Sequence, residues 1–154
     1  MIRVQEGDFD IGLEINRLTE GNTRIGGVSS FVGLVRDYTG NEKLTAMTLE
    51  HYPGMTEKQL ATLETKARAR WNLEDLLIVH RYGTLAPGDR IVLVITASSH
   101  RDDSLESCRF LIDWLKTNAP FWKLEDTASG SEWVSTRESD NSAVDRWVRD
   151  GVSK

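Results

Sequence analysis

Apolar residues along the chain recur with two periods, one of about 3.6 residues and one of about 2 residues. The first period is typical of amphipathic helices, and the second is typical of strands with one buried face. The helical period predicts helices near residues 11–20, 56–71, 103–117 and 142–148. Runs rich in β-branched and aromatic residues predict strands at residues 2–4, 25–35, 44–52, 76–82, 90–97, 121–126 and 133–136.

Residues that cap helices stand at the start of three of the predicted helices. Asp8 or Asp10 precedes the first helix, and Thr56 is placed to cap the second. Asp103 and Glu106 have the spacing of a capping box for the third helix. We therefore expect the third helix to begin beside Asp103.

The strand at residues 25–35 is interrupted by glycine at three positions, residues 26, 27 and 33. Glycine weakens a strand, so it indicates a bulge or the close approach of another group. A polar, turn-like segment follows, which predicts a hairpin over residues 31–50. The strand at residues 90–97 is apolar on both faces and must be covered on both. Helices that alternate with hairpins of this kind predict an α+β fold.

Composition favours a single globular domain spanning residues 1–154, with the end of the chain frayed from about residue 150. The net charge of −5 makes general nucleic-acid binding a poor explanation of the chain. One cysteine allows no intrachain disulfide, and the first residues contain no apolar segment of signal-peptide length. We therefore expect a cytoplasmic protein.

Basic residues are placed at the ends of elements in the stretch from Ser98 to Glu125, while its apolar residues lie inside elements. Lys116 borders the apolar stripe of the third helix, one turn before that helix ends. It is either a lysine whose stem covers apolar surface near a helix C-terminus, or a partly desolvated amine crowded by other cations. The second interpretation suits acid–base or acyl chemistry.

The other cations of this stretch also have two interpretations. His100 and Arg101 follow a buried strand and precede a helix N-terminus, which favours anions, but Asp102 and Asp103 are close enough to satisfy them. Taken alone, Lys123 is interpreted as a solvated charge flanked by anchoring aromatic residues, and Arg36, at the end of the glycine-containing strand, as a charge at a hairpin tip. Taken together, the cations predict one wall of an anion-binding site.

Other chemistries fit the sequence less well. The three histidines lack the spacing of metal ligands, and Cys108 lies in the middle of an apolar stripe, where it is expected to be core. We expect neither a metal nor a cofactor.

Four segments together resemble the catalytic (large) subunit of molybdopterin synthase, and they stand in that family's order. They are LEHYPGMTEK at 49–58, HRYGTLAPGD at 80–89, SSHR at 98–101 and LKTNAPFWK at 115–123, with WVSTRESD at 133–140 in support. The resemblance implies an α/β hammerhead-like domain with an additional small antiparallel sheet. It also implies sulfur transfer from the C-terminal Gly-Gly thiocarboxylate of a small ubiquitin-like partner to cyclic pyranopterin monophosphate, forming the dithiolene of molybdopterin. The large subunits are expected to form a homodimer within a heterotetramer.

The same resemblance assigns residues to the site. Lys116 and Lys123 are implied to be catalytic, with His100 and Arg101 reaching in from the neighbouring subunit. The full set implied for substrate binding is Arg36, His100, Arg101, Lys116, Lys123 and Glu125, and the partner's tail is expected to pass Phe31 and Ile112. Ile112 replaces a methionine of some members, and Leu34 stands where the family can have a lysine.

Two rival functions use the same cations. One is a non-catalytic adaptor that captures a partner's C-terminal carboxylate. The other is a phosphate-ester enzyme that needs no thiocarboxylated partner. The resemblance ranks sulfur transfer above both.

Overall fold

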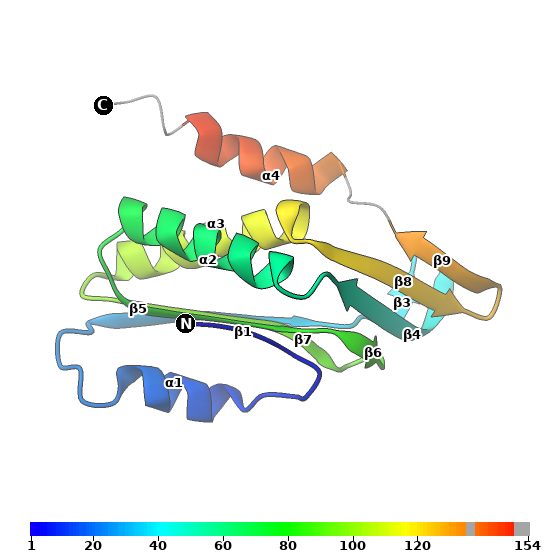
Figure 1. Cartoon of the computed structure of the whole chain (residues 1–154), viewed down its shortest axis with the longest axis horizontal. Coiled ribbons are helices and arrows are strands. Elements are labelled where there is room, and N and C mark those ends of the chain that lie inside the picture. Colours follow the sequence, from blue (N-terminus) through cyan, green and yellow to red (C-terminus); the bar gives the residue numbers. More distant parts are fainter. Residues whose placement is uncertain (135–137, 150–154) are drawn as a thin grey trace.

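The computed structural model describes residues 1–134 and 138–149, which form two β-sheets and four helices (Figure 1). The strands are β1 (Ile2–Gln5), β2 (Gly27–Leu34), β3 (Tyr38–Thr39), β4 (Glu42–His51), β5 (Leu73–Arg81), β6 (Gly83–Leu85), β7 (Arg90–Ser98), β8 (Phe121–Thr127) and β9 (Gly130–Val134). The helices are α1 (Ile11–Thr19), α2 (Met55–Arg70), α3 (Arg101–Asn118) and α4 (Glu138–Arg149).

The first sheet has the strand order β1-β5-β7-β2, with β1 parallel to β5 and the other pairs antiparallel. The second sheet has the order β3-β4-β8-β9, and β6 also pairs with β4. All pairs in the second sheet are antiparallel. The prediction of an α+β fold with an additional antiparallel sheet is confirmed.

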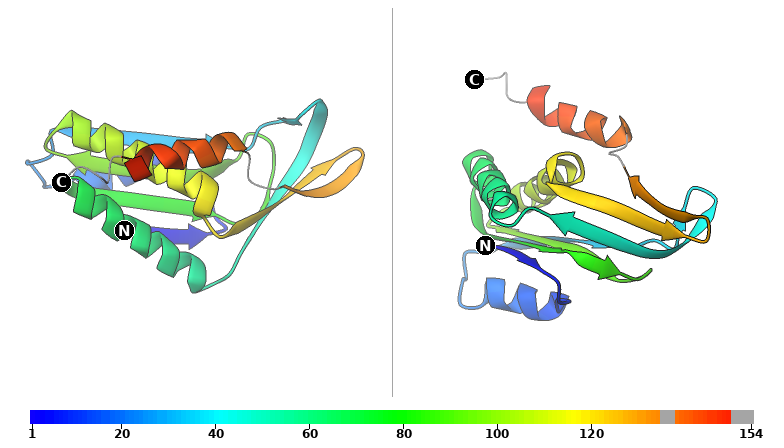
Figure 2. Two further views of the ribbon diagram at one scale, coloured as in Figure 1. Left: turned by 90° about the horizontal axis from the view of Figure 1, so that it is seen from above. Right: turned by 45° about the vertical axis from the view of Figure 1, so that its right-hand side comes forward.

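Helices cover both faces of the first sheet (Figure 1). α2 and α3 lie on one face and α1 lies on the other, which explains why β7 is apolar on both sides. α4 packs on the outer side of α3 (Figure 2). The second sheet extends to one side of this body, as the rotated views make clear (Figure 2).

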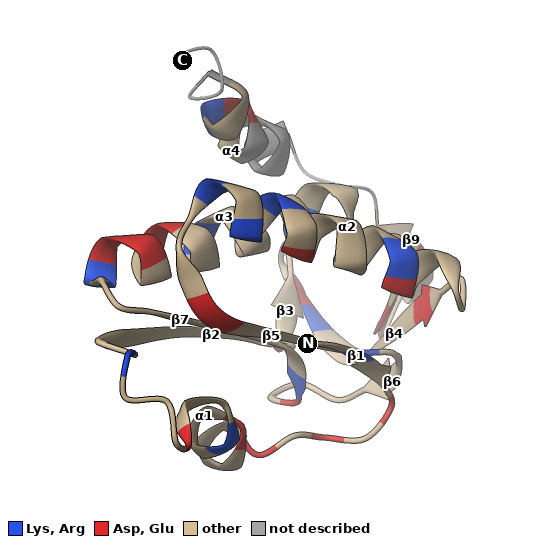
Figure 3. Ribbon diagram, turned by 60° about the vertical axis from the view of Figure 1, so that its left-hand side comes forward, with Lys and Arg blue, Asp and Glu red and all other residues tan. Residues whose placement is uncertain are grey.

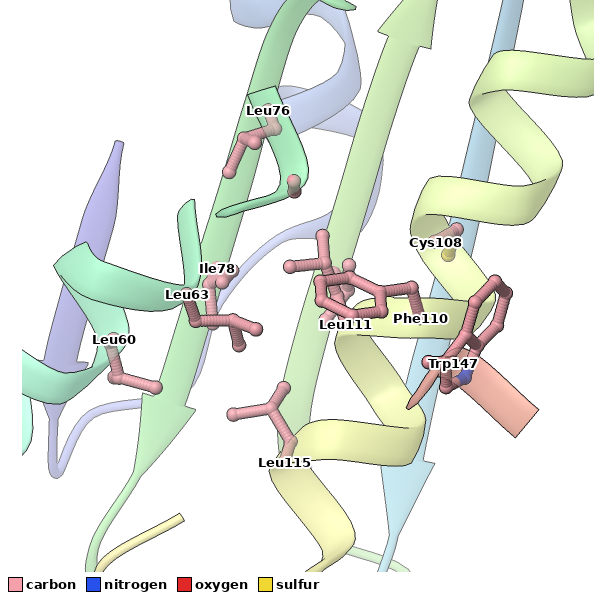
Figure 4. Close-up of a cluster of buried hydrophobic side chains, with 11 residues drawn as sticks. Leu60, Leu63, Leu76, Ile78, Cys108, Phe110, Leu111, Leu115 and Trp147 are labelled. Carbon is pink, nitrogen blue, oxygen red and sulfur yellow. The ribbon is translucent and has the colours of Figure 1, made fainter. Parts of the chain in front are cut away.

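The main core lies between the first sheet and the helices α2 and α3 (Figure 4). Leu111 of α3 and Ile78 of β5 are fully buried in it. Trp147 of α4 closes the outer side by packing edge-to-face against Phe110 and Trp71. Its indole N–H donates to Asp113 Oδ2 at 2.9 Å. This aromatic cluster therefore fixes α4 to the rest of the fold.

The predicted hairpin over residues 31–50 is wrong in its strands, since only a short hairpin between β3 and the start of β4 forms at the predicted turn. β2 pairs with β7 of the first sheet, whereas β4 pairs with β3, β6 and β8 of the second. Val35 lies between β2 and β4, is 2% exposed, and belongs to the core of the second sheet. Its N–H donates to the Asp89 carbonyl at 2.9 Å, and its carbonyl accepts from the Gly88 N–H at 2.8 Å. These bonds hold the chain at the crossing between sheets, so β2 does not pair with β4.

Two of the three predicted helix starts are also wrong. Asp10 caps α1 by accepting from the Leu13 N–H, as expected. α2 instead begins after Gly54, whose N–H donates to Glu57, while Thr56 is buried and bonds to the Tyr52 carbonyl. Threonine can satisfy its hydroxyl on a carbonyl one turn back, and in α2 this replaces capping.

α3 begins at Arg101, two residues before the predicted start. Its N-cap is His100, which makes no capping bond through its side chain. Asp102 and Asp103 lie within the first turn, where the helix dipole favours acidic side chains. The sequence pattern therefore placed Asp103 correctly near the start of the helix, but Asp103 lies inside the first turn and is not the N-cap.

The glycines of the predicted strand at residues 25–35 have the two roles expected of them. A Cβ on Gly26 would lie 2.2 Å from the Ser99 carbonyl oxygen, so the two chain segments approach too closely for any side chain. At Gly33 a Cβ would lie 2.7 Å from Val92 Cγ1, and the register with β7 shifts between Gly33 and Leu34. This irregularity ends β2 next to the site described below.

Two predictions fall partly or wholly outside the described residues: the last positions of the strand at 133–136 and the fraying from about residue 150. Within the described part of the chain, no helix is long and apolar enough to cross a membrane.

Candidate active site

A cavity of about 670 Å³ lies where the two sheets and the C-terminal end of α3 meet. Its wall contains the ends of β2, β5 and β7, and residues of β4 and β8 from the second sheet. Six of the eight residues assigned to the site from the sequence line it: Phe31, Arg36, Ile112, Lys116, Lys123 and Glu125. Segments far apart in the chain therefore contribute to one cavity of the size that small-molecule sites have.

β8 contributes three of the lining residues because strand side chains alternate between faces. Phe121, Lys123 and Glu125 are at every second position and all line the cavity. Across the ladder, Lys123 is opposite Leu49 and Glu125 is opposite Met47. The cation and the carboxylate of β8 are therefore held opposite apolar residues of β4, in a partly apolar cavity where charge interactions are stronger than in water.

The end of α3 contributes Ile112 and Lys116, which are four residues apart and so lie on one face of the helix. Leu115 beside them is 8% exposed and anchors this turn in the main core. Lys116 itself is exposed at the rim. This is the position expected for a lysine whose stem borders the apolar stripe and whose amine reaches the cavity.

Arg36 reaches the cavity because the chain crosses between the sheets immediately before it. Val35 is buried and bonded to the turn before β7, which fixes the backbone on which Arg36 stands. Arg36 and Tyr38 also line an adjoining open hollow of about 840 Å³. Lys43 borders this hollow too, so cations line both spaces.

His100 and Arg101 do not join the other site residues within this chain. Both belong to the start of α3, whereas Lys116 is near its end. The Arg101 side chain is 88% exposed and contacts Asp102 at 3.6 Å. The start of α3, where basic and acidic residues follow one another, lies on the outside of the molecule (Figure 3).

His80 of β5 lines the cavity and was considered in the sequence only as a metal ligand. It is 8% exposed, and its ring stacks on Phe121 with centroids 3.7 Å apart and planes 13° apart. Its Nδ1 donates to the Arg81 carbonyl at 2.9 Å, since a carbonyl can only accept. The pKa of His80 is lowered to about 4, mainly by burial. The hydrogen bond to the Arg81 carbonyl opposes this shift, and Lys123 and His51 add to it. A histidine within a strand otherwise rich in leucine, isoleucine and valine was the signal that could have found it.

Cys108 is remote from this chemistry. It is 7% exposed in the main core, and burial raises the pKa of its thiol to about 11. A thiol in that environment is not a nucleophile at neutral pH. Among the described residues, no three histidine, cysteine, aspartate or glutamate side chains gather in a way that could hold a metal ion.

Comparison with known proteins matches this chain to one family over nearly its whole length. The family model of the MoaE protein matches residues 4–118. A molybdopterin synthase catalytic subunit from Ralstonia nicotianae is 52% identical over 99% of this chain and 88% of its own. The chain belongs to the molybdopterin synthase catalytic subunit family. The resemblance found in its sequence motifs is thus confirmed.

Solved structures agree with this membership of the molybdopterin synthase family. A molybdopterin biosynthesis MoaE protein from Burkholderia ambifaria superposes with a TM-score of 0.83 and 48% identity, covering 99% of each chain. A complex of subunits 1 and 2 of the molybdopterin-converting factor from Helicobacter pylori has the same fold. Its TM-score is 0.72 at 21% identity, over 88% of this chain and 91% of that one.

Proposed function

We propose that the cavity is where the C-terminal thiocarboxylate of a small ubiquitin-like partner meets cyclic pyranopterin monophosphate. Membership of the family makes the chain a molybdopterin synthase catalytic subunit, which acts in molybdopterin synthesis by sulfur transfer. The observation that carries the assignment to this cavity is the gathering of Arg36, Lys116 and Lys123 around one partly apolar space, in a chain of net charge −5.

The cations answer an electrostatic requirement of the reaction. Both reactants, a thiocarboxylate and a cyclic phosphate, are anions, so they repel each other unless positive groups stand between them. We assign Lys116 to the acyl carbon of the tail, as a general acid or a transient amine. Lys123 and Arg36 hold the phosphate or the negative charge that develops, and Glu125 orients a lysine or a water molecule.

The sulfur atom comes from the partner and needs no cysteine of this chain. It bonds to a carbon of the pterin substrate as that carbon's bond to oxygen breaks, and the oxygen leaves as water or stays on the phosphate as the cyclic ester opens. The bond from sulfur to the acyl carbon of the tail then breaks. Water supplies the oxygen atom that replaces sulfur on the acyl carbon, so that the tail then ends in an ordinary carboxylate. This accounts for a site without an accessible thiol, since Cys108 is buried.

The partner's tail enters past Phe31 and Ile112 in this proposal. Phe31 is 38% exposed although it is a large apolar residue, and it lines the cavity together with Ile112. Gly33 lies beside it at the irregular end of β2. A Gly-Gly tail has no side chains, so its backbone can pass close to Phe31 and Ile112 as it enters the cavity.

His100 and Arg101 complete the site from the neighbouring subunit in a homodimer. Both are exposed, and their own α3 carries them away from its cavity. We propose that one small partner binds at each end of this dimer to give a heterotetramer. A complex of two subunits is known for the related Helicobacter pylori protein. The single buried cysteine is in keeping with a cytoplasmic location.

The test is incubation of the protein with the cyclic pterin phosphate and a thiocarboxylated partner, followed by detection of the dithiolene product. Product should form only when all three are present. An adaptor would bind the partner and leave the pterin unchanged, and a phosphate-ester enzyme would act on the pterin without the thiocarboxylate. Either outcome would overturn the proposal.

A further inference from the structure

His80 lies at the point where the first sheet passes into the second. It is the penultimate residue of β5, and only Arg81 and Tyr82 separate it from β6 of the second sheet. Leu77 and Val79 of the same strand pack on the face of the first sheet that α1 covers. Leu76 and Ile78 pack on the opposite face, which α2 and α3 cover. By strand alternation His80 shares the side of Ile78, and there it forms part of the cavity wall.

The ring of His80 is held in a fixed orientation. The hydrogen bond from Nδ1 to the Arg81 carbonyl fixes the orientation of one edge of the imidazole ring, and Phe121 covers one face of the ring. Phe121 is in turn flanked by His51 of β4, its cross-strand partner, with ring centroids 5.9 Å apart. Phe121 is therefore clamped between the two sheets, through an imidazole from each.

Phe121 is the first residue of β8, and Lys123 follows on the same face of the strand. The strand is joined to α3 by Ala119 and Pro120 alone, and the Phe121 N–H donates to the Ala119 carbonyl at 2.8 Å. The position of Phe121 thus sets where Lys123 enters the cavity. A small displacement at this point moves the lysine along the cavity wall.

We propose that His80 is a positioning residue for sulfur transfer, which holds Lys123 in place through its stack on Phe121 and adds no charge of its own. The role of Lys123 belongs to the proposed function, and the inference rests on it. Burial keeps the imidazole uncharged at neutral pH because it lowers the pKa of His80. A cationic ring would repel Lys123.

The test compares kcat in the reconstituted sulfur-transfer assay for variants on both sides of the stack. His80→Leu keeps the site apolar but removes the flat ring, and its kcat should fall by roughly tenfold or more, because small misplacements of catalytic groups are costly. KM for the pterin should change less than kcat. His80→Phe restores a flat ring and should recover most of the kcat.

Phe121→Leu breaks the same stack from the other side. If both residues act through one contact, the double variant His80→Leu with Phe121→Leu should be no slower than the slower single variant. Val79→Ala is the matched control, because Val79 is fully buried on the opposite side of the same strand. It should lower the melting temperature without lowering kcat.

Three results would overturn the inference. They are a normal kcat in His80→Leu, an equal loss in His80→Phe, and losses that multiply in the double variant. Turnover by the unmodified protein in the same assay establishes the proposed function separately, so the failure of one can be told from the failure of the other.

Discussion

Arg101 and Lys116 lie at opposite ends of the same helix, since α3 begins with Arg101 and ends two residues after Lys116. At 1.5 Å per residue, their backbones are about 22 Å apart along the helix axis. One chain cannot bring both side chains into one cavity. If both act in the same reaction, a site must combine residues of two chains.

Mixing two inactive variants tests this shared site. Arg101→Ala and Lys116→Ala should each be inactive alone, and after subunit exchange the mixture should regain part of the activity. Mixed dimers then contain one intact site and one that lacks both residues. The measurement is dithiolene formation before and after exchange, with proof of exchange from a size-tagged chain. No recovery in exchanged dimers would contradict the shared site.

Lys116 is expected to be essential to turnover and dispensable to folding. Lys116→Ala should lower the rate by roughly a hundredfold or more, since a preorganised charge is lost. The melting temperature should stay unchanged, because the side chain is exposed. Full activity of this variant would remove Lys116 from the mechanism.

The variant Lys116→Arg separates the two roles of the amine. Arginine keeps the positive charge but not the compact amine that can give up a proton. Activity close to normal would indicate that Lys116 only neutralises an anion. Activity as low as in Lys116→Ala would indicate proton transfer or contact with the acyl carbon. Partner binding, measured by calorimetry, should survive in both variants.

His80 should make the folded state sensitive to mild acid. Its folded pKa of about 4 is below the ordinary 6.5, so the unfolded chain binds the proton more readily. The stabilisation is present above pH 6.5 and is lost as the pH falls toward 4, by about 3 kcal/mol in total. The titratable groups that bear on the ring are Lys123 of β8 and His51 of β4.

Urea unfolding at several pH values between 7 and 4 measures this loss. His80→Phe cannot titrate, so its stability should fall less over the same window. Asp8 does not interfere with this measurement. The hydrogen bond to Arg90 lowers the pKa of Asp8 to about 2, so the contribution of Asp8 to the free energy of unfolding is lost only below pH 3.8. Equal pH dependence in the two proteins would contradict the prediction.

Trp147 should account for much of the attachment of α4. Trp147→Ala removes a buried ring that contacts Trp71 and Phe110, at a cost of about 3–5 kcal/mol in the free energy of unfolding. Trp147→Phe keeps a ring but loses the bond to Asp113, at a cost of about 1 kcal/mol. Val148→Ala is the control, since Val148 is 65% exposed and should change stability by less than about 0.5 kcal/mol. Urea unfolding of the three variants would rank them, and equal midpoints would contradict the prediction.

Local patterns were sufficient for most elements and for one part of the site. The stripe of α3 predicted that Lys116 borders the apolar surface, and Lys116 lines the cavity. This follows from the geometry of a single helix. The family resemblance alone joined Lys116 to Lys123, Glu125, Arg36 and Phe31, which no local pattern connects.

The errors concern relationships between distant segments. Residues 31–50 have the local appearance of a hairpin, but β2 pairs with β7, some sixty residues later in the chain. Strand partners are chosen by packing across the whole fold, and a turn-like sequence does not reveal them. His80 was passed over for the same reason. Its importance comes from a stack on Phe121, forty-one residues away, and from a cavity that exists only where two sheets meet.

The crossing at Val35 has a consequence for the kinetics of the enzyme. Its two backbone bonds tie the segment between β2 and β4 to the turn before β7, and the link from α3 to β8 is only two residues long. The two sheets are therefore joined at several points around the cavity. We expect these connections to prevent a hinge motion of one sheet relative to the other. We expect a cavity that is formed before its reactants arrive. Association should then be a single bimolecular step, whose rate rises linearly with partner concentration and falls with added salt.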